Sequence, residues 1–171
     1  MENQSPYQAQ LDEYEARRSK AMEMGGVRKL GVRREQGLLN ARERIDKLVD
    51  PGSFIESGLF ATSAYSQEDR ERTPTDGKVT GFATIEGREV AVVSNDFTIK
   101  GASSSATNGK KIAHMKRVAS QRGLPLVFLG ESSGARMPDT MGSRGMATML
   151  GNDPTQYQLS LIHISEPTRP Y

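Results

Sequence analysis

Residues 124–136 read L-P-L-V-F-L-G-E-S-S-G-A-R, an apolar run followed by a polar turn made largely of small residues. The run 124–129 has the continuous hydrophobicity of a strand buried on both faces, and we expect the chain to turn into a helix after it. Such a turn leaves backbone N–H groups without helical acceptors, and the helix dipole adds positive charge beside them. The turn at 131–136 therefore predicts an anion site, either an oxyanion hole for a thioester or a phosphate cradle.

The segment before this turn predicts a β-hairpin followed by a helix. Residues 78–96 are rich in Val, Phe, Thr and Ile on either side of a turn at Gly87, which is the pattern of a hairpin. Asn108 is in position to cap a helix over 109–122, which a glycine and a proline should end. A ββα unit that feeds another strand and helix is therefore expected. The two candidate anion loops at strand exits are 101–105, which reads G-A-S-S-S, and 132–136.

The first 37 residues are charged and predict an arm with a helical segment, which a Gly-Gly pair interrupts. A clearer helix follows, because Asn40 can cap it with Glu43 three residues on, in the capping-box arrangement. The sequence D-P-G at 50–52 should stop this helix. The arm also carries a basic cluster, which we interpret as a solvated face rather than a phosphate site. The cluster consists of Arg28, Lys29, Arg33 and Arg34.

Composition excludes several classes of function. The 171 residues include 23 basic and 21 acidic side chains, a net charge of +2, which lacks the basic surplus of a nucleic-acid binder. The absence of cysteine excludes a disulfide scaffold, a cysteine nucleophile and a cysteine-based zinc site. The carboxylates are dispersed without a histidine partner, so no metal site is predicted. Without a long apolar window or a basic leader, a cytoplasmic protein with no membrane contact is expected.

The end of the chain has an unusual sequence. Residues 159–169 read L-S-L-I-H-I-S-E-P-T-R, which matches the in-frame translation of a transposase-type sequencing adapter. We therefore expect 159–171 to be an artefactual tail and exclude it, with His163, from the prediction of the fold. The natural chain is expected to continue past Gln158. On this interpretation the given chain is an N-terminal fragment that is inactive alone.

The sequence also admits a serine hydrolase. Residues 130–134 satisfy G-x-S-x-G, the nucleophile elbow of α/β-hydrolases, between a predicted strand and a predicted helix. Ser132 would need an imidazole to take its proton, and in that fold the histidine lies downstream. No histidine follows Ser132 before residue 159, and His114 lies upstream on a predicted helix. The hydrolase stays an alternative, because a histidine farther along the chain would complete it.

Several stretches together resemble the β-type carboxyltransferase subunits of biotin-dependent acyl-CoA carboxylases, such as acetyl- and propionyl-CoA carboxylases. Each stretch alone is weak, but their shared order and spacing are specific, and the resemblance covers 25–158. It implies an α/β fold of the crotonase-like type, a spiral of ββα turns that is incomplete here and preceded by a helical arm. The stretches are L-N-A-R-E-R-I (39–45), L-V-D-P-G-S-F (48–54), D-G-K-V-T-G (76–81), S-N-D-F-T (94–98), G-A-S (101–103), K-K-I (110–112) and S-S-G-A-R (132–136).

The resemblance divides the chain into a charged arm at 1–37, the first part of an acyl-CoA carboxyltransferase N-terminal domain at 38–158, and the tail at 159–171. One departure concerns the turn, where the family usually reads D-S-G-G-A-R and this chain has Ser133 in place of the first glycine. An oxyanion hole uses backbone N–H, which serine also has, so the function survives if Ser133 needs no positive φ. The second half of such subunits, with another oxyanion hole and the biotin contacts, is expected beyond Gln158.

The chemistry that the resemblance implies moves a carboxyl group from carboxybiotin to the α-carbon of an acyl-CoA of the acetyl-CoA or propionyl-CoA class. The thioester becomes an enolate, and its oxygen is assigned to the catalytic N–H groups of Ser133 and Gly134. The liberated biotin nitrogen takes the α-proton, so the protein need supply no general base. Arg136 is expected to anchor the turn by a salt bridge rather than touch a CoA phosphate. The residues assigned to acyl-CoA binding are Gly101, Ala102, Ser103, Ala135 and Arg136.

The resemblance further implies that biotin arrives on a partner carrier and that this chain binds no metal. The implied partners are a biotin carboxylase, a biotin carboxyl carrier subunit and further copies of the chain, in a dimer-based assembly such as a hexamer. A biotin-dependent decarboxylase or transcarboxylase of the same family is an alternative that differs in its partners. A hydratase of the crotonase type and a non-catalytic scaffold subunit also remain open.

Overall fold

The computed structural model describes residues 6–141, and the expected tail at 159–171 lies outside them. The described residues form one four-stranded sheet in the order β1-β2-β3-β4. Strands β1, β2 and β3 are antiparallel neighbours, whereas β4 pairs with β3 in parallel. The strands are β1 (Ile55–Glu56), β2 (Lys78–Ile85), β3 (Arg88–Asn95) and β4 (Leu126–Leu129). The helices are α1 (Gln8–Met22), α2 (Val27–Glu35), α3 (Ala41–Leu48), α4 (Gln67–Arg72), α5 (Ala106–Arg122) and α6 (Met137–Thr140), with short 3-10 turns η1 (Pro74–Gly77) and η2 (Lys100–Ala102).

The predicted hairpin is confirmed as β2 and β3, joined by the two residues Glu86 and Gly87. Both turn residues have positive φ, 50° and 76°, as the tight turn that matches strand twist requires. Asp50 accepts the N–H groups of both turn residues at 2.9 Å and the hydroxyl of Thr84 at 2.5 Å. The Thr84 hydroxyl first, and then the turn N–H groups, lower the pKa of Asp50. Asp50, two residues after the end of α3, thus fixes the hairpin turn.

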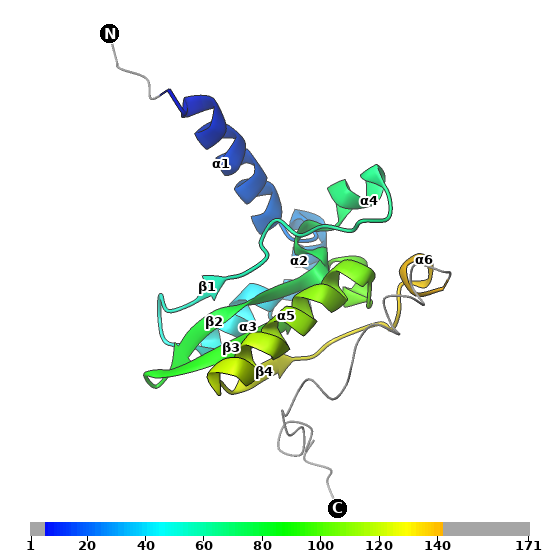
Figure 1. Ribbon diagram of the computed structural model, residues 1–171. Helices are drawn as coiled ribbons and strands as arrows, with labels where there is room; N and C mark the ends of the chain where they lie inside the picture. The colour runs from blue at the N-terminus through cyan, green and yellow to red at the C-terminus, as the bar shows by residue number, and fades with distance from the viewer. Residues whose placement is uncertain (1–5, 142–171) are drawn as a thin grey trace, which may run out of the picture.

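The two faces of this hairpin bury two different sets of side chains. Because strand side chains alternate, Val90 and Val92 face one way while Ala91 and Val93 face the other. The first pair packs on α3 through Ile45, and the second pair packs on α5. Figure 1 shows α5 across one face of the sheet and α3 on the opposite face. Each fully buried Val or Ile contributes roughly 1.5–3 kcal/mol, so both layers hold the hairpin in place.

The predicted helix over 109–122 exists, but its start was wrong. Helix α5 begins at Ala106, and its cap is Ser105, whose hydroxyl accepts the N–H of Asn108. Asn108 instead occupies the third helical position and returns its side-chain oxygen to the N–H of Ser105 at 3.0 Å. The two residues form a reciprocal capping box, so Asn108 does help to cap the helix, but the helix begins about one turn earlier than predicted. The predicted end is confirmed, because Gly123 adopts the left-handed conformation.

The N-terminal arm is helical, as predicted. Helix α1 extends away from the sheet and buries only Ala21 among its residues, and the Gly-Gly pair separates it from α2 (Figure 1). The capping box of Asn40 and Glu43 at the start of α3 is also confirmed. The basic cluster was partly misread, because the Arg33 side chain is buried. Its partners are described with the site below.

One expectation about the decisive stretch was wrong, and another was confirmed only in part, because the helix expected after the turn is present but short. Strand β4 is not buried on both faces, because among its residues only Leu126 is buried and the other three are half-exposed. It is the outer strand of the described sheet, and one of its edges pairs with β3. Residues 131–136 contain no helical turn, and the helix that follows them, α6, has only four residues. The dipole of so short a helix adds little positive charge to the turn.

A glycine in β2 permits β1 to approach the hairpin. A Cβ on Gly81 would lie 2.3 Å from the carbonyl oxygen of Ile55 and 2.6 Å from the ring of Phe54. Gly81→Ala should therefore lower the free energy of unfolding by about 1–3 kcal/mol, as other overpacking substitutions do. The measurement is urea denaturation of the protein expressed from its complete gene.

Gly109→Ala is the matched control, because a Cβ at Gly109 in α5 meets nothing within 4 Å and its φ is not positive. This change should raise the free energy of unfolding by about 0.5–1 kcal/mol through helix propensity alone. A Gly81→Ala protein as stable as the unmodified one would show that β1 does not pack on β2 as described.

Candidate functional site

The two predicted anion loops lie side by side. Backbone hydrogen bonds join them in a parallel arrangement, from the Ser133 N–H to the Gly101 carbonyl at 2.9 Å and from the Ser104 N–H to the Gly134 carbonyl at 2.8 Å. A third bond, from the Arg136 N–H to the Ser104 carbonyl at 2.8 Å, extends the pairing. The segments 101–105 and 132–136, both expected at strand exits, are therefore brought together.

The N–H groups of the turn differ in their availability. The Ser133 N–H is engaged by the Gly101 carbonyl, so this residue does not present a free donor in the described conformation. The Gly134 N–H meets the Ser132 hydroxyl at 3.2 Å, a side-chain acceptor that can rotate away. Ser133 has no positive φ, whereas Gly134 has a φ of 116° that L side chains rarely adopt. Ser133 therefore needs no positive φ, which was the condition for a serine in place of the usual glycine.

The loop at 101–105 is bent into its shape by left-handed residues. Lys100, Gly101 and Ala102 have φ values of 44°, 61° and 51°. The Ala102 N–H donates to the Ile99 carbonyl at 2.8 Å. Ala102, Ser103 and Ser105 are buried. Non-glycine residues such as Lys100 and Ala102 rarely adopt this conformation, so surrounding contacts must hold the loop.

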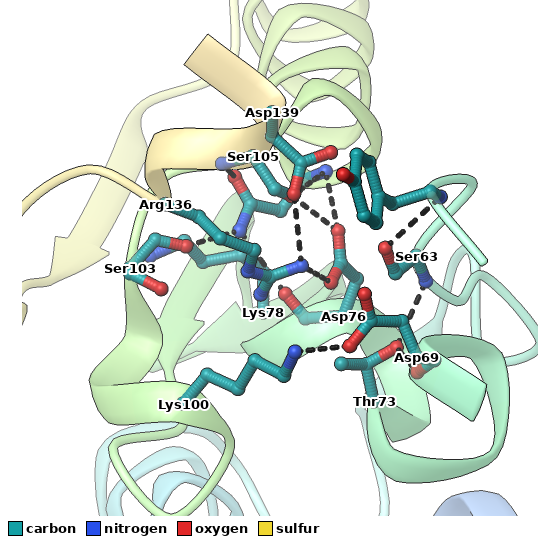
Figure 2. A network of polar contacts seen from close by, with 12 residues as sticks. Ser63, Asp69, Thr73, Asp76, Lys78, Lys100, Ser103, Ser105, Arg136 and Asp139 are labelled. Atoms are coloured by element: carbon teal, nitrogen blue, oxygen red, sulfur yellow. Dashed lines mark hydrogen bonds and ion pairs between the residues drawn. The ribbon is translucent and has the colours of Figure 1, made fainter. Parts of the chain in front are cut away.

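Those contacts come from a buried polar network beneath both loops (Figure 2). Asp76, in the turn before β2, is fully buried and accepts a hydrogen bond from the Arg136 guanidinium at 2.8 Å. The Ser105 hydroxyl donates to the other oxygen of the same carboxylate, and the Asn108 N–H reaches that oxygen at 3.1 Å. Asp139 adds a second carboxylate 3.5 Å from Arg136. Arg136 thus forms a buried salt bridge, the contact expected of it from the sequence.

Two buried lysines complete the base of the loops. The Lys78 ammonium donates to the Ala102 carbonyl at 2.7 Å, and the Lys111 ammonium donates to the carbonyls of Thr75 at 3.0 Å and Lys78 at 2.5 Å. Burial is the main cause that lowers the pKa of each lysine from 10.5 to about 8, against the attraction of nearby carboxylates. The analysis of the sequence missed both lysines and Asp76. The D-G-K stretch at 76–78 and the K-K-I stretch at 110–112 were the signals that pointed to them.

Glu131, the first residue of the turn, is held from the opposite side by helices α2 and α3. Arg33 donates both terminal nitrogens to its carboxylate at 2.8 Å, and Arg44 lies 3.5 Å away. The Asn95 side-chain N–H donates to the Glu131 carbonyl at 2.9 Å. The Arg33 guanidinium also lies 5.9 Å from the centre of the Phe97 ring, and both residues line a groove of about 390 Å³. These bonds fix the start of the turn.

The geometry does not support a serine nucleophile at Ser132. Its hydroxyl donates to the carbonyls of Ala102 at 3.2 Å and Gly134 at 3.4 Å rather than to a base. Within residues 6–141 the one imidazole is that of His114, which is exposed on α5 and lies 3.0 Å from Arg117. Ser132 also lacks the strained left-handed backbone that a nucleophile elbow uses.

A family model described as the carboxyl transferase domain matches residues 33–166. The chain belongs to this family. Its matched range includes both loops, the network beneath them and the arginines that hold Glu131, and it reaches into the segment 159–171. Among residues 6–141, no group of three His, Cys, Asp or Glu side chains is arranged to hold a metal, and no helix is long and apolar enough to cross a membrane.

Relatives of this carboxyl transferase domain include two propionyl-CoA carboxylase beta chains. That of Roseobacter denitrificans is 40% identical over 136 residues, which are 78% of this chain and 26% of the relative. The mitochondrial chain of Homo sapiens is 38% identical over 133 residues, or 75% of this chain and 25% of the relative. The chain thus spans about a quarter of the length of the curated relatives it matches.

Solved structures agree on the fold. The transcarboxylase 12S hexamer, with methylmalonyl-coenzyme A and methylmalonic acid bound, matches with a TM-score of 0.75 and 32% identity over 85% of this chain and 28% of its own. A single-chain, multi-domain long-chain acyl-CoA carboxylase matches with a TM-score of 0.73 and 36% identity over 82% of this chain and 15% of its own. The predicted crotonase-like α/β fold with a helical N-terminal arm is confirmed.

The buried lysines make the stability of the domain depend on pH. The pKa of Lys111 falls from 10.5 to about 8 on folding, so between these values the unfolded state binds more protons and the folded state gains stability as pH rises. As pH rises across this window, the unfolding free energy of the unmodified protein should increase relative to that of Lys111→Met, by up to about 3 kcal/mol. Denaturation curves at several pH values measure it.

Lys110→Met is the matched control, because Lys110 is the neighbouring residue on α5 and is exposed. Its difference from the unmodified protein should stay flat over the same window. A flat difference for Lys111→Met as well would contradict the burial of a protonated lysine under the loops.

Proposed function

We propose that this protein is a carboxyltransferase that moves a carboxyl group from carboxybiotin to the α-carbon of an acyl-CoA. The observation that carries the proposal is the parallel pairing of the two glycine- and serine-rich loops in a chain of the carboxyl transferase domain family. Two relatives are propionyl-CoA carboxylase beta chains, so an acyl-CoA of the acetyl-CoA or propionyl-CoA class is the proposed substrate. The transcarboxylase with bound methylmalonyl-coenzyme A supports the same class.

The Gly134 N–H is the proposed principal donor to the thioester oxygen, because it is exposed and its present acceptor is a rotatable hydroxyl. The Ser133 N–H is the second donor, available once its bond to Gly101 opens. Donors aimed at the oxygen that becomes negative lower the barrier to enolate formation. The loop residues Gly101, Ala102 and Ser103, with Ala135 beside them, line the approach of the acyl-pantetheine. Arg136 supports this approach from below rather than through contact with CoA.

The described turn holds no side chain suited to remove the α-proton. The Glu131 carboxylate is bound by two arginines, and the Ser132 hydroxyl donates to carbonyls. Carboxybiotin on a partner carrier supplies the carboxyl group and, after its N–C bond breaks, a ureido nitrogen that accepts the proton. The residues present fit this division, because exposed N–H donors without a free base suit an enolate whose proton goes to the second substrate. The biotin contacts are proposed to lie outside residues 6–141.

The proposed partners are a biotin carboxylase, a biotin carboxyl carrier subunit and further copies of the chain. A hexamer is among the expected assemblies, since the transcarboxylase relative forms one. A transcarboxylase or decarboxylase would use the same loops with another carboxyl donor or acceptor. Assays with radiolabelled bicarbonate, ATP and propionyl-CoA separate them from a carboxylase, which alone should fix the label into an acyl-CoA in the presence of its partners.

The Gly134 donor can be removed without a change in side chain. Because Gly134 has a φ of 116°, proline or alanine would distort the turn, whereas glycolic acid at this position replaces only the N–H by an ester oxygen. In the protein expressed from its complete gene, this ester should lower kcat by about 10²–10³, the usual cost of one oxyanion-hole donor. The measurements are carboxylation rate and affinity for a non-reactive acyl-CoA thioether.

The affinity for the thioether should stay within about tenfold, because the donor acts on the charge that develops in the transition state. The same ester at Gly52, an exposed glycine in the turn after α3, is the control, since it removes a backbone N–H that belongs to neither loop. A correctly assembled ester protein with normal kcat would exclude Gly134 as the donor.

Ser132 offers a separate test of the chemistry. Ser132→Ala should leave carboxyl transfer within about tenfold, because it removes hydrogen bonds worth roughly 0.5–1.5 kcal/mol and no nucleophile. A fluorophosphonate probe should leave the unmodified protein unlabelled at this position. Stoichiometric labelling of Ser132, together with ester hydrolysis that Ser132→Ala abolishes, would favour the serine hydrolase instead.

A further inference from the structure

The buried carboxylate of Asp76 receives hydrogen bonds from both sides of the candidate site. One oxygen accepts from Arg136, which ends the turn at 132–136, and the other accepts from Ser105 and Asn108, which end the loop at 101–105 and begin α5. The side-chain N–H of Asn108 returns to the Asp76 carbonyl at 3.1 Å and also reaches the Ser103 carbonyl at 2.8 Å. Asp76 therefore joins two segments whose bonded residues, Ser105 and Arg136, lie 29 and 60 positions after it in the chain.

Between Glu131 and Arg136 the turn has few anchors of its own. Residues 132–135 are exposed, so no buried apolar surface fixes them, and three backbone hydrogen bonds join the segment 132–136 to the neighbouring loop. The Arg136 side chain is 6% exposed and that of Asp76 is 0% exposed, so water screens their attraction poorly. This ion pair is the buried anchor closest in the chain to the Gly134 N–H.

Asp76 is not placed to act on substrate itself. Both carboxylate oxygens are occupied by protein donors, and the residue is fully buried beneath the loops (Figure 2). Its backbone has a φ of 48°, and that of Thr75 has a φ of 54°, a conformation that non-glycine residues adopt rarely. Surrounding bonds hold this turn, among them the Lys111 ammonium on the Thr75 carbonyl. The carboxylate is thus aimed at the loops by a backbone that is itself fixed.

The geometry points to Asp76 and Arg136 as a positioning pair that holds the two loops in register, so that the N–H of Gly134 faces the thioester oxygen. This inference rests on the proposed function for its effect on rate, but the pairing of the loops can be measured independently of any activity. A shift of a donor by about 1 Å can lower a rate by about 10²-fold. Loss of the pair should therefore affect kcat far more than acyl-CoA affinity.

The test uses the protein expressed from its complete gene, assembled with its partners. Asp76→Asn keeps the size of the side chain, tolerates the left-handed backbone and removes the charge. We expect kcat to fall by about ten- to hundredfold while the affinity for a non-reactive acyl-CoA thioether stays within about threefold. Arg136→Lys, which keeps a cation, should retain more kcat than Arg136→Gln. The double variant Asp76→Asn, Arg136→Gln should lose less than the product of the two single losses, because neither member of the pair is then left without the other.

Asp69→Asn is the matched control. It removes the ion pair between Asp69 and Lys100, the residue just before the loop at 101–105; the two side chains are 18% and 36% exposed, more than those of Asp76 and Arg136. A pair so placed is screened by water, so kcat should change by less than about threefold.

Amide hydrogen exchange gives the readout that does not depend on activity. In Asp76→Asn, peptides that cover 101–105 and 131–136 should both exchange faster, while a peptide from the middle of α5 keeps its protection. Unchanged exchange in either loop would overturn the inference, as would equal losses in kcat and acyl-CoA affinity. A purely structural role would instead lower the yield of folded protein and leave kcat per active site unchanged. If the unmodified protein transfers no carboxyl group, the proposed function fails and the exchange result alone decides the pairing.

Discussion

The buried carboxylate of Asp76 is the interaction on which the arrangement of the site depends. A carboxylate removed from water is costly unless donors replace its hydration, and here an arginine, a hydroxyl and a backbone N–H do so. These donors come from separate segments, so the requirement that each finds the carboxylate fixes where the segments run. The hairpin supplies the rigid base, because both its faces are packed and the turn that carries Asp76 leads directly into β2.

The charges beneath the loops also bear on chemistry. Lys78, Lys111 and Arg136 place three cations in the buried layer, against the carboxylates of Asp76 and Asp139. A pKa of about 8 leaves each lysine mostly protonated at neutral pH. Because the interior screens charge poorly, these cations would favour the negative enolate oxygen of the proposed reaction. Burial of these lysines costs stability, as active sites often do, and the packed hairpin offsets that cost.

The sequence was enough for elements whose signals are local. The hairpin follows from alternation around Gly87, and the start of α3 follows from the spacing of Asn40 and Glu43. The start of α5 was misjudged because Ser105 and Asn108 are both good caps and form one reciprocal box. The exposure of β4 could not be predicted, since hydrophobicity alone does not tell which side of a strand is covered. The network around Asp76 could not be predicted either, because its partners are distant in the chain.

The availability of the turn donors likewise depends on the register between two loops. A one-residue shift of 132–136 against 101–105 would free the Ser133 N–H and engage another, and no local pattern selects between these registers. The absence of a side chain at Gly101 selects the observed register. A Cβ on Gly101 would lie 2.3 Å from the Ser133 hydroxyl oxygen, so the loops reach this register only because position 101 lacks a side chain. The serine that replaces the usual family glycine is therefore accommodated by the glycine opposite it, while Gly134 keeps the backbone conformation that other residues rarely adopt.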